Sequence, residues 1–157
     1  MKTIITTENK RCEKFPSLFG SQLFKNAPLF SYAESLFYSG MTQFIEGYKG
    51  GFYEYVEIAE SDVEIEPSSF VPMLMNDSIV EMSNPFGTTE KLTEKAASLV
   101  TWLFVLEQIA NNINSNVAGR IFNVMEDVKY SYDKFTNNDG EKLFSPEDLT
   151  AIYRLTN

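Results

Sequence analysis

Carboxylates are the residues of this sequence whose spacing could most readily support catalysis. Glu54, Glu57, Glu64 and Glu66 lie close together in the chain. Two such groups on either side of a glycosidic bond can hydrolyse it, one as acid and the other as base or nucleophile. Acids at this spacing on a solvent-facing strand are far more often a hydrated surface. The spacing therefore gives no positive signal for an enzyme, and we expect no catalytic residue.

The other residue types that catalysis and metal binding require are scarce. The chain contains no histidine, which excludes Ser-His-Asp and Cys-His catalysis and every histidine-dependent metal site. Cys12 is the single cysteine, so neither a multi-thiolate metal site nor an intrachain disulfide can form. Neither of the glycine-rich patterns that bind phosphate groups, GxxxxGK[ST] and GxGxxG, occurs in the sequence. We expect no cofactor and no metal.

The segment "TNNDGEKLF" superficially resembles a calcium-binding loop. Asn137 and Asp139 match positions three and five of such a loop. Phe135 and Pro146 then occupy positions one and twelve, where carboxylates are required. We therefore expect an ordinary turn over residues 138–140.

The carboxylates belong to a longer segment whose charge is one-sided. Residues 50–90 contain nine acids and neither lysine nor arginine. Such a block must stay hydrated or meet a cationic partner, and a polar sheet face that discourages edge pairing explains it equally well. Six of the acids form what we call the candidate acidic surface: Glu54, Glu57, Glu60, Asp62, Glu64 and Glu66. The other three are Asp77, Glu81 and Glu90.

The whole chain is acidic as well, with a net charge of -9 and a pI near 4.5. Phosphate contacts require Lys and Arg to displace counterions, and only thirteen are present, so we expect no direct nucleic-acid binding. An acidic fold can approach a basic surface on another protein, although acidity also serves solubility alone.

Length and hydropathy indicate one soluble domain. The 157 residues suit a single core, and we divide them into a loose N-terminal arm (1–17), with a short extended piece at 3–6, and one domain (18–157). The N-terminal segment lacks the apolar run of a signal peptide, and "LVTWLFVL" is too short to cross a bilayer. We expect a cytoplasmic protein without a membrane partner.

The spacing of apolar residues predicts a helix followed by strands, and these elements position the acidic residues. A helix capped by Asn26, with Pro28 in its first turn, is expected to run until Gly50-Gly51 ends it. Alternation then predicts strands at 52–58 and 63–66. Two more strands are possible in "FVPMLM" and "SIVEM", the former confined to an edge or an irregular segment by Pro72.

Three further helices follow. The first is expected to begin near Thr88 or Thr89 and is apolar nearly all round, which indicates a central, buried position. "NNINSN" ends it, and another helix follows over 117–132. The last begins where Ser145 can cap and Pro146 takes the first position. About four helices and an antiparallel sheet of about three strands predict a compact α+β fold.

Several of these segments resemble the antirestriction proteins of the ArdB/KlcA family. "FPSLFG" (15–20) followed after a helix by "YKGGFYEYVEI" (48–58) is similar to the family's pattern, as are the later "AASLVTWLFVLEQIA" and "SPEDLTAIYRL". The similarity spans residues 11–155 through the order and spacing of these motifs. Two departures are "VEIEP" in the second strand and a C-terminal Asn157 where family members often have Asp. Whether Asn157 alters activity is open.

The resemblance implies a single antirestriction-like domain, 18–157, carried by plasmids, phages or genomic islands. Its implied role is to protect incoming DNA by inhibiting type I restriction–modification enzymes, without a reaction or a cofactor. The implied partner is that enzyme or an associated host factor, reached either by DNA mimicry or by an indirect route. The alternative is an acidic interaction module that binds another basic protein or assembly.

Overall fold

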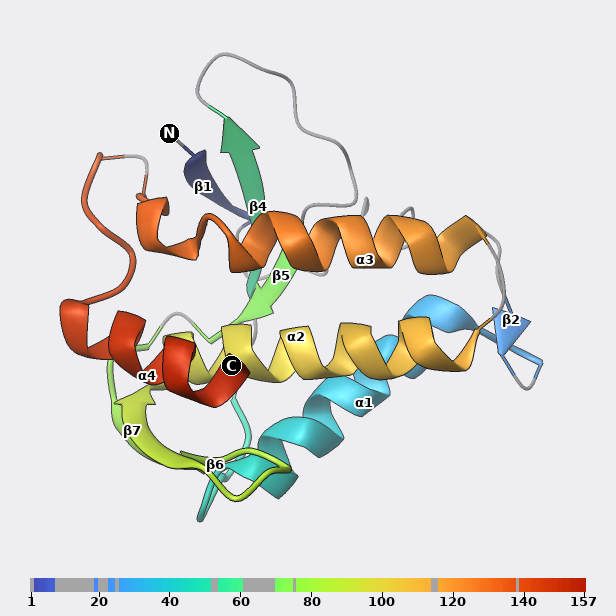
Figure 1. Ribbon diagram of the computed structural model, residues 1–157, viewed down its shortest axis with the longest axis horizontal. Helices are drawn as coiled ribbons and strands as arrows, with labels where there is room; N and C mark the ends of the chain where they lie inside the picture. Colours follow the sequence, from blue (N-terminus) through green and yellow to red (C-terminus); the bar gives the residue numbers. More distant parts are fainter. Residues whose placement is uncertain are drawn as a thin grey trace.

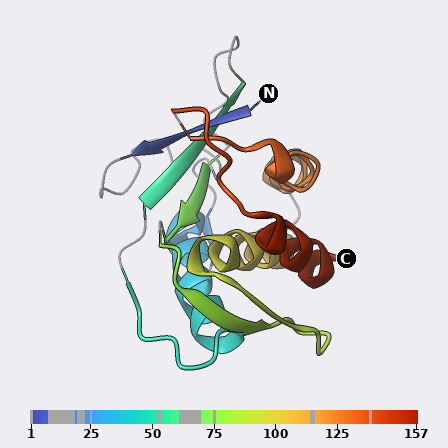
Figure 2. The ribbon, with the colours of Figure 1, turned by 90° about the vertical axis from the view of Figure 1, so that its left-hand side faces the viewer.

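One long helix, α2 (Glu94–Asn112), runs through the middle of the molecule, and the other elements pack around it (Figure 1). This structure is a computed structural model. It describes residues 2–7, 19, 23–24, 26–51, 54–60, 70–74, 76–113, 116–137 and 139–157. A three-stranded sheet and a two-stranded ribbon lie on opposite sides of α2 (Figure 2).

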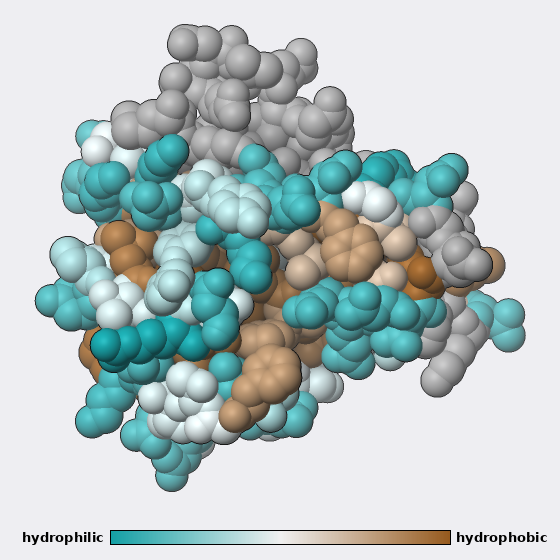
Figure 3. Space-filling model, in the orientation of Figure 1, coloured by the Kyte–Doolittle hydropathy of each residue, from teal (hydrophilic) through white to brown (hydrophobic). Residues whose placement is uncertain are grey.

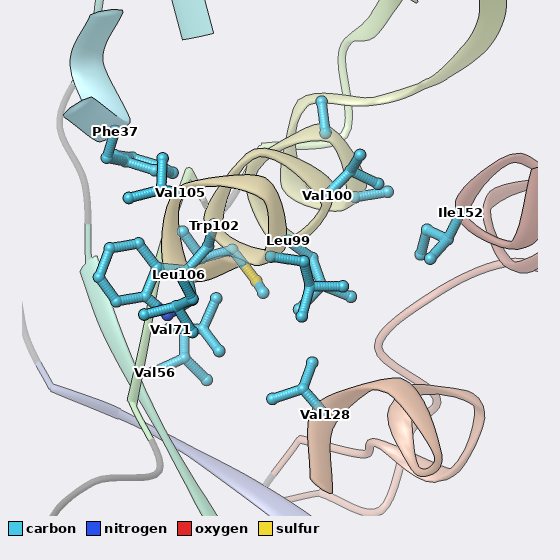
Figure 4. Packing of buried hydrophobic residues seen from close by; sticks show 14 of the residues in the cluster. Phe37, Val56, Val71, Leu99, Val100, Trp102, Val105, Leu106, Val128 and Ile152 are labelled. Carbon is cyan, nitrogen blue, oxygen red and sulfur yellow. The ribbon is translucent and has the colours of Figure 1, made fainter. Parts of the chain in front are cut away.

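The central position of α2 follows from its composition. Residues 96–103 are all buried, so no side of the helix faces water in these turns. This confirms the prediction of a buried central helix. Trp102 is fully buried, and its ring meets those of Phe19 and Phe37 edge-on at centroid distances of 6.5 and 6.0 Å. Figure 4 shows Trp102 in the same core as Val56 and Val71, which come from the sheet.

The expected start of α2 was wrong by about one turn. Thr89–Thr93 forms strand β7, paired with β6 (Ile79–Ser83) from Ile79 opposite Thr93 to Ser83 opposite Thr89. The helix begins after Thr93, whose hydroxyl accepts the Ala96 N–H at 3.2 Å. Pairing with β6 is a non-local interaction, so the local cap signals could not reveal it.

Helix α1 (Leu29–Phe44) is shorter at both ends than predicted. Asn26 does not cap it but takes a positive φ of 67° in the turn between β2 (Leu23–Phe24) and β3 (Ala27–Pro28). Pro28 occupies the cap position without a side-chain hydrogen bond.

The C-terminal end of α1 also comes earlier than the predicted stop at Gly50-Gly51. Ile45 ends the helix by turning extended and forming a bridge with Met82 of β6. Gly50 has a positive φ of 86°, but it lies in the loop that follows. The tertiary contact with β6 therefore fixes this helix end.

The three-stranded sheet has the order β1 (Lys2–Thr7), β4 (Glu54–Glu60), β5 (Phe70–Met73), with both pairings antiparallel. The extended piece expected at 3–6 falls within β1. Pro72 lies on β5, an edge strand of this sheet, as predicted. The strand expected at 52–58 corresponds to β4, whereas 63–66 lies outside the described residues.

The chain ends with two helices beside α2. Helix α3 (Asn116–Lys129) returns along α2, and the short helix η2 (Tyr132–Lys134) follows it, so the predicted helix over 117–132 was three residues too long. Helix α4 (Pro146–Thr156) packs on β7 and α2. The Asp148 N–H donates to the Ser145 hydroxyl oxygen at 3.1 Å, which confirms the predicted cap. The α+β fold is confirmed.

Candidate functional site

Strand β4 carries half of the candidate acidic surface. Glu54, Glu57 and Glu60 belong to it, while Asp62, Glu64 and Glu66 lie outside the described residues. β4 is the middle strand, and position 57 is opposite positions 5 and 70. Position 54 is paired with β5 alone and position 60 with β1 alone.

Of the other three acids of the segment, two form ion pairs with cations outside it, and the third lies opposite a lysine on the neighbouring strand. The Asp77 carboxylate pairs with the Lys95 ammonium at 3.0 Å, and Glu90 pairs with Arg154 at 3.5 Å. Glu81 lies directly opposite Lys91 across the β6–β7 ribbon.

These pairings show that the negative charge at one end of the acidic segment is balanced by nearby cations. No base lies between residues 50 and 90 of the sequence, yet the fold brings bases from α2, β7 and α4 to this end of the segment. We therefore keep the candidate acidic surface at 54–66 and do not extend it to the ribbon.

A cleft of about 600 Å³ lies between the start of α4, the loop after η2 and Asp77. Lys95 pairs with Asp77, and the Lys142 ammonium donates to the Asp133 carbonyl oxygen at 3.1 Å, while the side chains of Asp133 and Glu141 also line the cleft. Within the described ranges, no group of three or more Cys, Asp or Glu side chains is placed to hold a metal ion. The cleft shows no convergent catalytic set.

One wall of this cleft is the segment that resembled a calcium loop. The Asn137 side-chain oxygen accepts the N–H groups of Asp139 and Glu141 at 2.9 and 3.0 Å, and Gly140 has a positive φ of 79°. The oxygen that a calcium ion would need is therefore used by the backbone. This confirms the expectation of a turn rather than an ion site.

Asp148 is a buried carboxylate, but its position gives it a structural role. It is 2% exposed; one carboxylate oxygen accepts the Thr93 N–H at 2.9 Å and the other accepts the Thr93 hydroxyl at 2.7 Å. The first residue before α2 is thereby tied to the first turn of α4. We call this pair the Thr93–Asp148 latch. Both oxygens of the carboxylate are engaged, so it is not poised as a general base.

A small cavity of about 190 Å³, the tyrosine pocket, opens between the end of α3 and the last turn of α4. It is lined by Lys129, Tyr130, Tyr132, Tyr153, Thr156 and Asn157. Burial first, then the charge of Asp133 and then Tyr153, raises the pKa of Tyr132 above its usual value. Its hydroxyl therefore stays protonated at neutral pH.

Sequence reasoning missed the tyrosine pocket. Tyr130 and Tyr132 are near neighbours in the chain, but Tyr153 comes from a different helix. The pair in "YSY" was the available signal, and it became meaningful only once α4 was placed beside the end of α3. Asn157, whose identity departs from the family pattern, also lines this pocket.

An exposed phenylalanine lies at the tip of the β6–β7 ribbon, close to the same helix end. The Asn84 side-chain oxygen accepts the N–H groups of Phe86 and Thr88 at 3.0 and 2.9 Å. The Asn84 amide donates to the Leu155 carbonyl oxygen of α4 at 2.9 Å. Phe86 is 84% exposed on this tightly hydrogen-bonded turn. Figure 3 shows hydrophobic surface where the end of α4 meets the ribbon.

Comparison with known proteins gives a match in structure alone. No protein-family model and no curated protein matches the sequence. A solved structure matches 100% of this chain and 94% of its own, with a TM-score of 0.70 and 22% sequence identity. It is described as the structure of the KlcA and ArdB proteins, with a novel fold and antirestriction activity against type I DNA restriction systems in vivo but not in vitro.

This chain has the KlcA/ArdB fold. The match runs over the whole chain, so it includes β4, the α4 end and the ribbon rather than one shared motif. The resemblance inferred from the sequence motifs is therefore confirmed at the level of the fold. Among the described residues, no helix has the length and apolarity needed to traverse a bilayer.

Proposed function

We propose that this chain is an antirestriction protein that inhibits type I restriction–modification enzymes and so protects incoming plasmid or phage DNA. The observation that carries the proposal is the full-length match to the KlcA and ArdB structure, at a TM-score of 0.70. A fold alone does not give a function. The ordered sequence motifs of the same family add independent support.

The proposed action is inhibition by binding, without catalysis. The sequence has no histidine, and the buried carboxylate of Asp148 is engaged by Thr93. In the 600 Å³ cleft, Lys95 pairs with Asp77 and Lys142 donates to a backbone carbonyl oxygen. These features support a protein that acts by binding through its surface rather than through a reactive group.

We further propose that the candidate acidic surface contacts a basic region of a protein partner. The net charge of -9 draws a cationic surface towards the chain, and three of the six acidic positions lie on β4, the middle strand of the sheet. The KlcA and ArdB proteins act in vivo but not in vitro. A restriction enzyme is present in both settings, so that behaviour supports an associated host factor as the partner, with the restriction enzyme itself as the alternative.

The first test is the plating efficiency of unmodified phage on cells with an active type I system, with and without the protein. We expect plating to rise by several orders of magnitude. The same measurement with Glu57→Gln and Glu60→Gln combined should show weaker protection. The matched control is Glu107→Gln with Glu126→Gln, which removes two exposed carboxylates from α2 and α3.

The results of these experiments distinguish an antirestriction protein from an acidic interaction module, and a direct route from one through a host factor. Unchanged plating with folded, well-expressed protein would refute antirestriction and leave the acidic interaction module. Full protection by the Glu57/Glu60 variant would move the contact away from β4. Inhibition of a purified type I enzyme by the purified protein would show a direct route, whereas protection confined to cells would identify a host factor as the partner.

A further inference from the structure

We infer that the tyrosine pocket binds an arginine side chain of a protein partner. This is a second contact, on α4 and η2, and it does not depend on the antirestriction role. The argument rests on the chemistry of the pocket walls, its size, the charge of the chain and the exposed aromatic residues around it.

The walls of the pocket are held by ordered backbone. On one side the Tyr130 and Ser131 N–H groups donate to the Glu126 and Val128 carbonyl oxygens, at 3.0 and 3.2 Å, closing the end of α3. On the other side the Asn157 N–H donates to the Tyr153 carbonyl oxygen at 3.1 Å. The three tyrosines are therefore presented from two fixed segments.

The groups that line the pocket suit a planar cation. Tyr130, Tyr132 and Tyr153 make no side-chain hydrogen bond to another described residue, so their hydroxyls are open to a ligand. A guanidinium has five donors in one plane and stacks on aromatic faces, so it can use both the rings and the hydroxyl oxygens. A purely apolar ligand would bury these hydroxyls without partners, which is unfavourable.

The size of the pocket limits the ligand to about one side chain. Its volume of about 190 Å³ lies below the roughly 300–1,000 Å³ of small-molecule sites. A cofactor or nucleotide would not fit, while the end of one long side chain would.

The charge of the protein favours a cationic ligand over an anionic one in the tyrosine pocket, and Lys129 is the residue that opposes this preference. The chain carries a net charge of -9, and the charge of Asp133, which lines the neighbouring larger cleft, reaches Tyr132 and contributes to its raised pKa, so an anion would meet repulsion. Lys129 at the rim opposes a cation, but it is exposed on a flexible stem and can turn away. The sign of its effect on binding therefore reports the charge of the ligand.

Exposed aromatic residues around the pocket indicate that the arginine belongs to a protein. Tyr130 is 80% and Tyr153 61% exposed, and Phe86, on the turn tied to Leu155, is 84% exposed. Aromatic side chains are enriched at protein interfaces and are frequent hot spots. A preformed turn lowers the entropy cost of using Phe86 as an anchor.

The test is an NMR titration of the 15N-labelled full chain with the blocked tripeptide Gly-Arg-Gly, compared with Gly-Lys-Gly and Gly-Glu-Gly. We expect saturable shifts from the arginine peptide at residues 129–132 and 153–157, and weaker shifts from the lysine peptide. Tyr153→Ala and Tyr130→Ala should each weaken binding about two- to fivefold, as expected for an exposed cation–π contact. Lys129→Gln should strengthen it about twofold by removing a nearby like charge.

The control is Phe122→Ala, which removes an exposed aromatic residue from another part of α3 and should leave the shifts unchanged. Equal binding of the lysine peptide would contradict recognition of the planar group. Shifts from the glutamate peptide that weaken after Lys129→Gln would identify an anion site instead, and weaker arginine binding in that variant would contradict the inferred repulsion. Shifts that are absent or spread over the surface would refute the inference. None of these results bears on phage plating, so the two proposals fail separately.

Discussion

Removing the Asp148 carboxylate is the sharpest test of how this fold is held together. Asp148→Ala deletes both hydrogen bonds to Thr93 and leaves the Thr93 N–H without its acceptor in a buried site. A hydrogen bond to a charged group contributes about 1.5–3 kcal/mol, so the two together predict a loss of about 3–6 kcal/mol. A domain of this size is stable by about 5–15 kcal/mol, so the variant should still fold.

Urea unfolding followed by Trp102 fluorescence measures this loss. Trp102 is the single tryptophan and is fully buried beside Phe19 and Phe37, so its emission reports the core. We expect the unfolding midpoint to fall while the slope stays the same, because the surface exposed on unfolding hardly changes. The melting temperature should fall by about 10 °C, at about 2–4 °C per kcal/mol.

Two further variants make the reasoning refutable. Glu147→Ala removes an exposed carboxylate one position earlier in α4 and should cost no more than about 1 kcal/mol, its interaction with the helix end. Thr93→Val removes the other side of the latch. Combined with Asp148→Ala, it should cost clearly less than the sum of the two single changes. A loss below about 1 kcal/mol for Asp148→Ala, or full additivity, would show that the latch does not join α2 to α4 energetically.

Three other predictions follow from packing, pH and charge. Gly40→Val should destabilise the chain by about 1–3 kcal/mol in urea unfolding, because a Cβ there would lie 2.8 Å from the Thr101 methyl group, and adding Thr101→Ser should recover part of the loss. The raised pKa of Tyr132 contributes stability that is present below its ordinary value of 10.0 and is lost as pH rises through the folded-state value. Tyr132→Phe should therefore flatten the fall in unfolding free energy that sets in as pH rises past 10.0, the ordinary pKa of tyrosine. Neutralising Glu57 and Glu60 should lower phage plating more than the matched control does, and equal plating would remove β4 from the contact.

Local signals in the sequence predicted the helices whose ends are set locally. Ser145 and Pro146 begin α4 as expected, because a cap and a first-turn proline act within a few residues. The mostly apolar stretch around Trp102 predicted a central helix, and α2 is buried on every side over residues 96–103. Both features depend only on residues that lie close together in the sequence.

Elements whose ends are set by distant partners could not be predicted in the same way. Thr88 and Thr89 had the chemistry of a cap, but pairing of β7 with β6 moved the start of α2 to Thr93. Likewise the end of α1 is fixed by the bridge from Ile45 to Met82, not by the later glycines. In each case a non-local pairing outweighed a valid local preference.

The candidate sites likewise combine features set by the local sequence with features set by distant parts of the chain. The strand positions of Glu54 and Glu57 followed from alternation, and the middle place of β4 depends on β1, which comes from the start of the sequence. The cations that meet Asp77 and Glu90 come from α2 and α4, so a charge count along the sequence could not anticipate them. The tyrosine pocket joins residues about twenty positions apart and had no periodic signal.

The two proposed contact surfaces have different physical strengths, and a partner can use both. Charges on β4 act over a Debye length of about 8–10 Å and chiefly raise the rate of encounter, so their effect should weaken with salt. Rings such as Tyr153 and Phe86 act only on contact and chiefly slow dissociation. The ribbon acids Asp77 and Glu90, already paired with cations, add little to the long-range field. A basic partner would therefore be attracted by one face of this fold and retained by the aromatic end of α4.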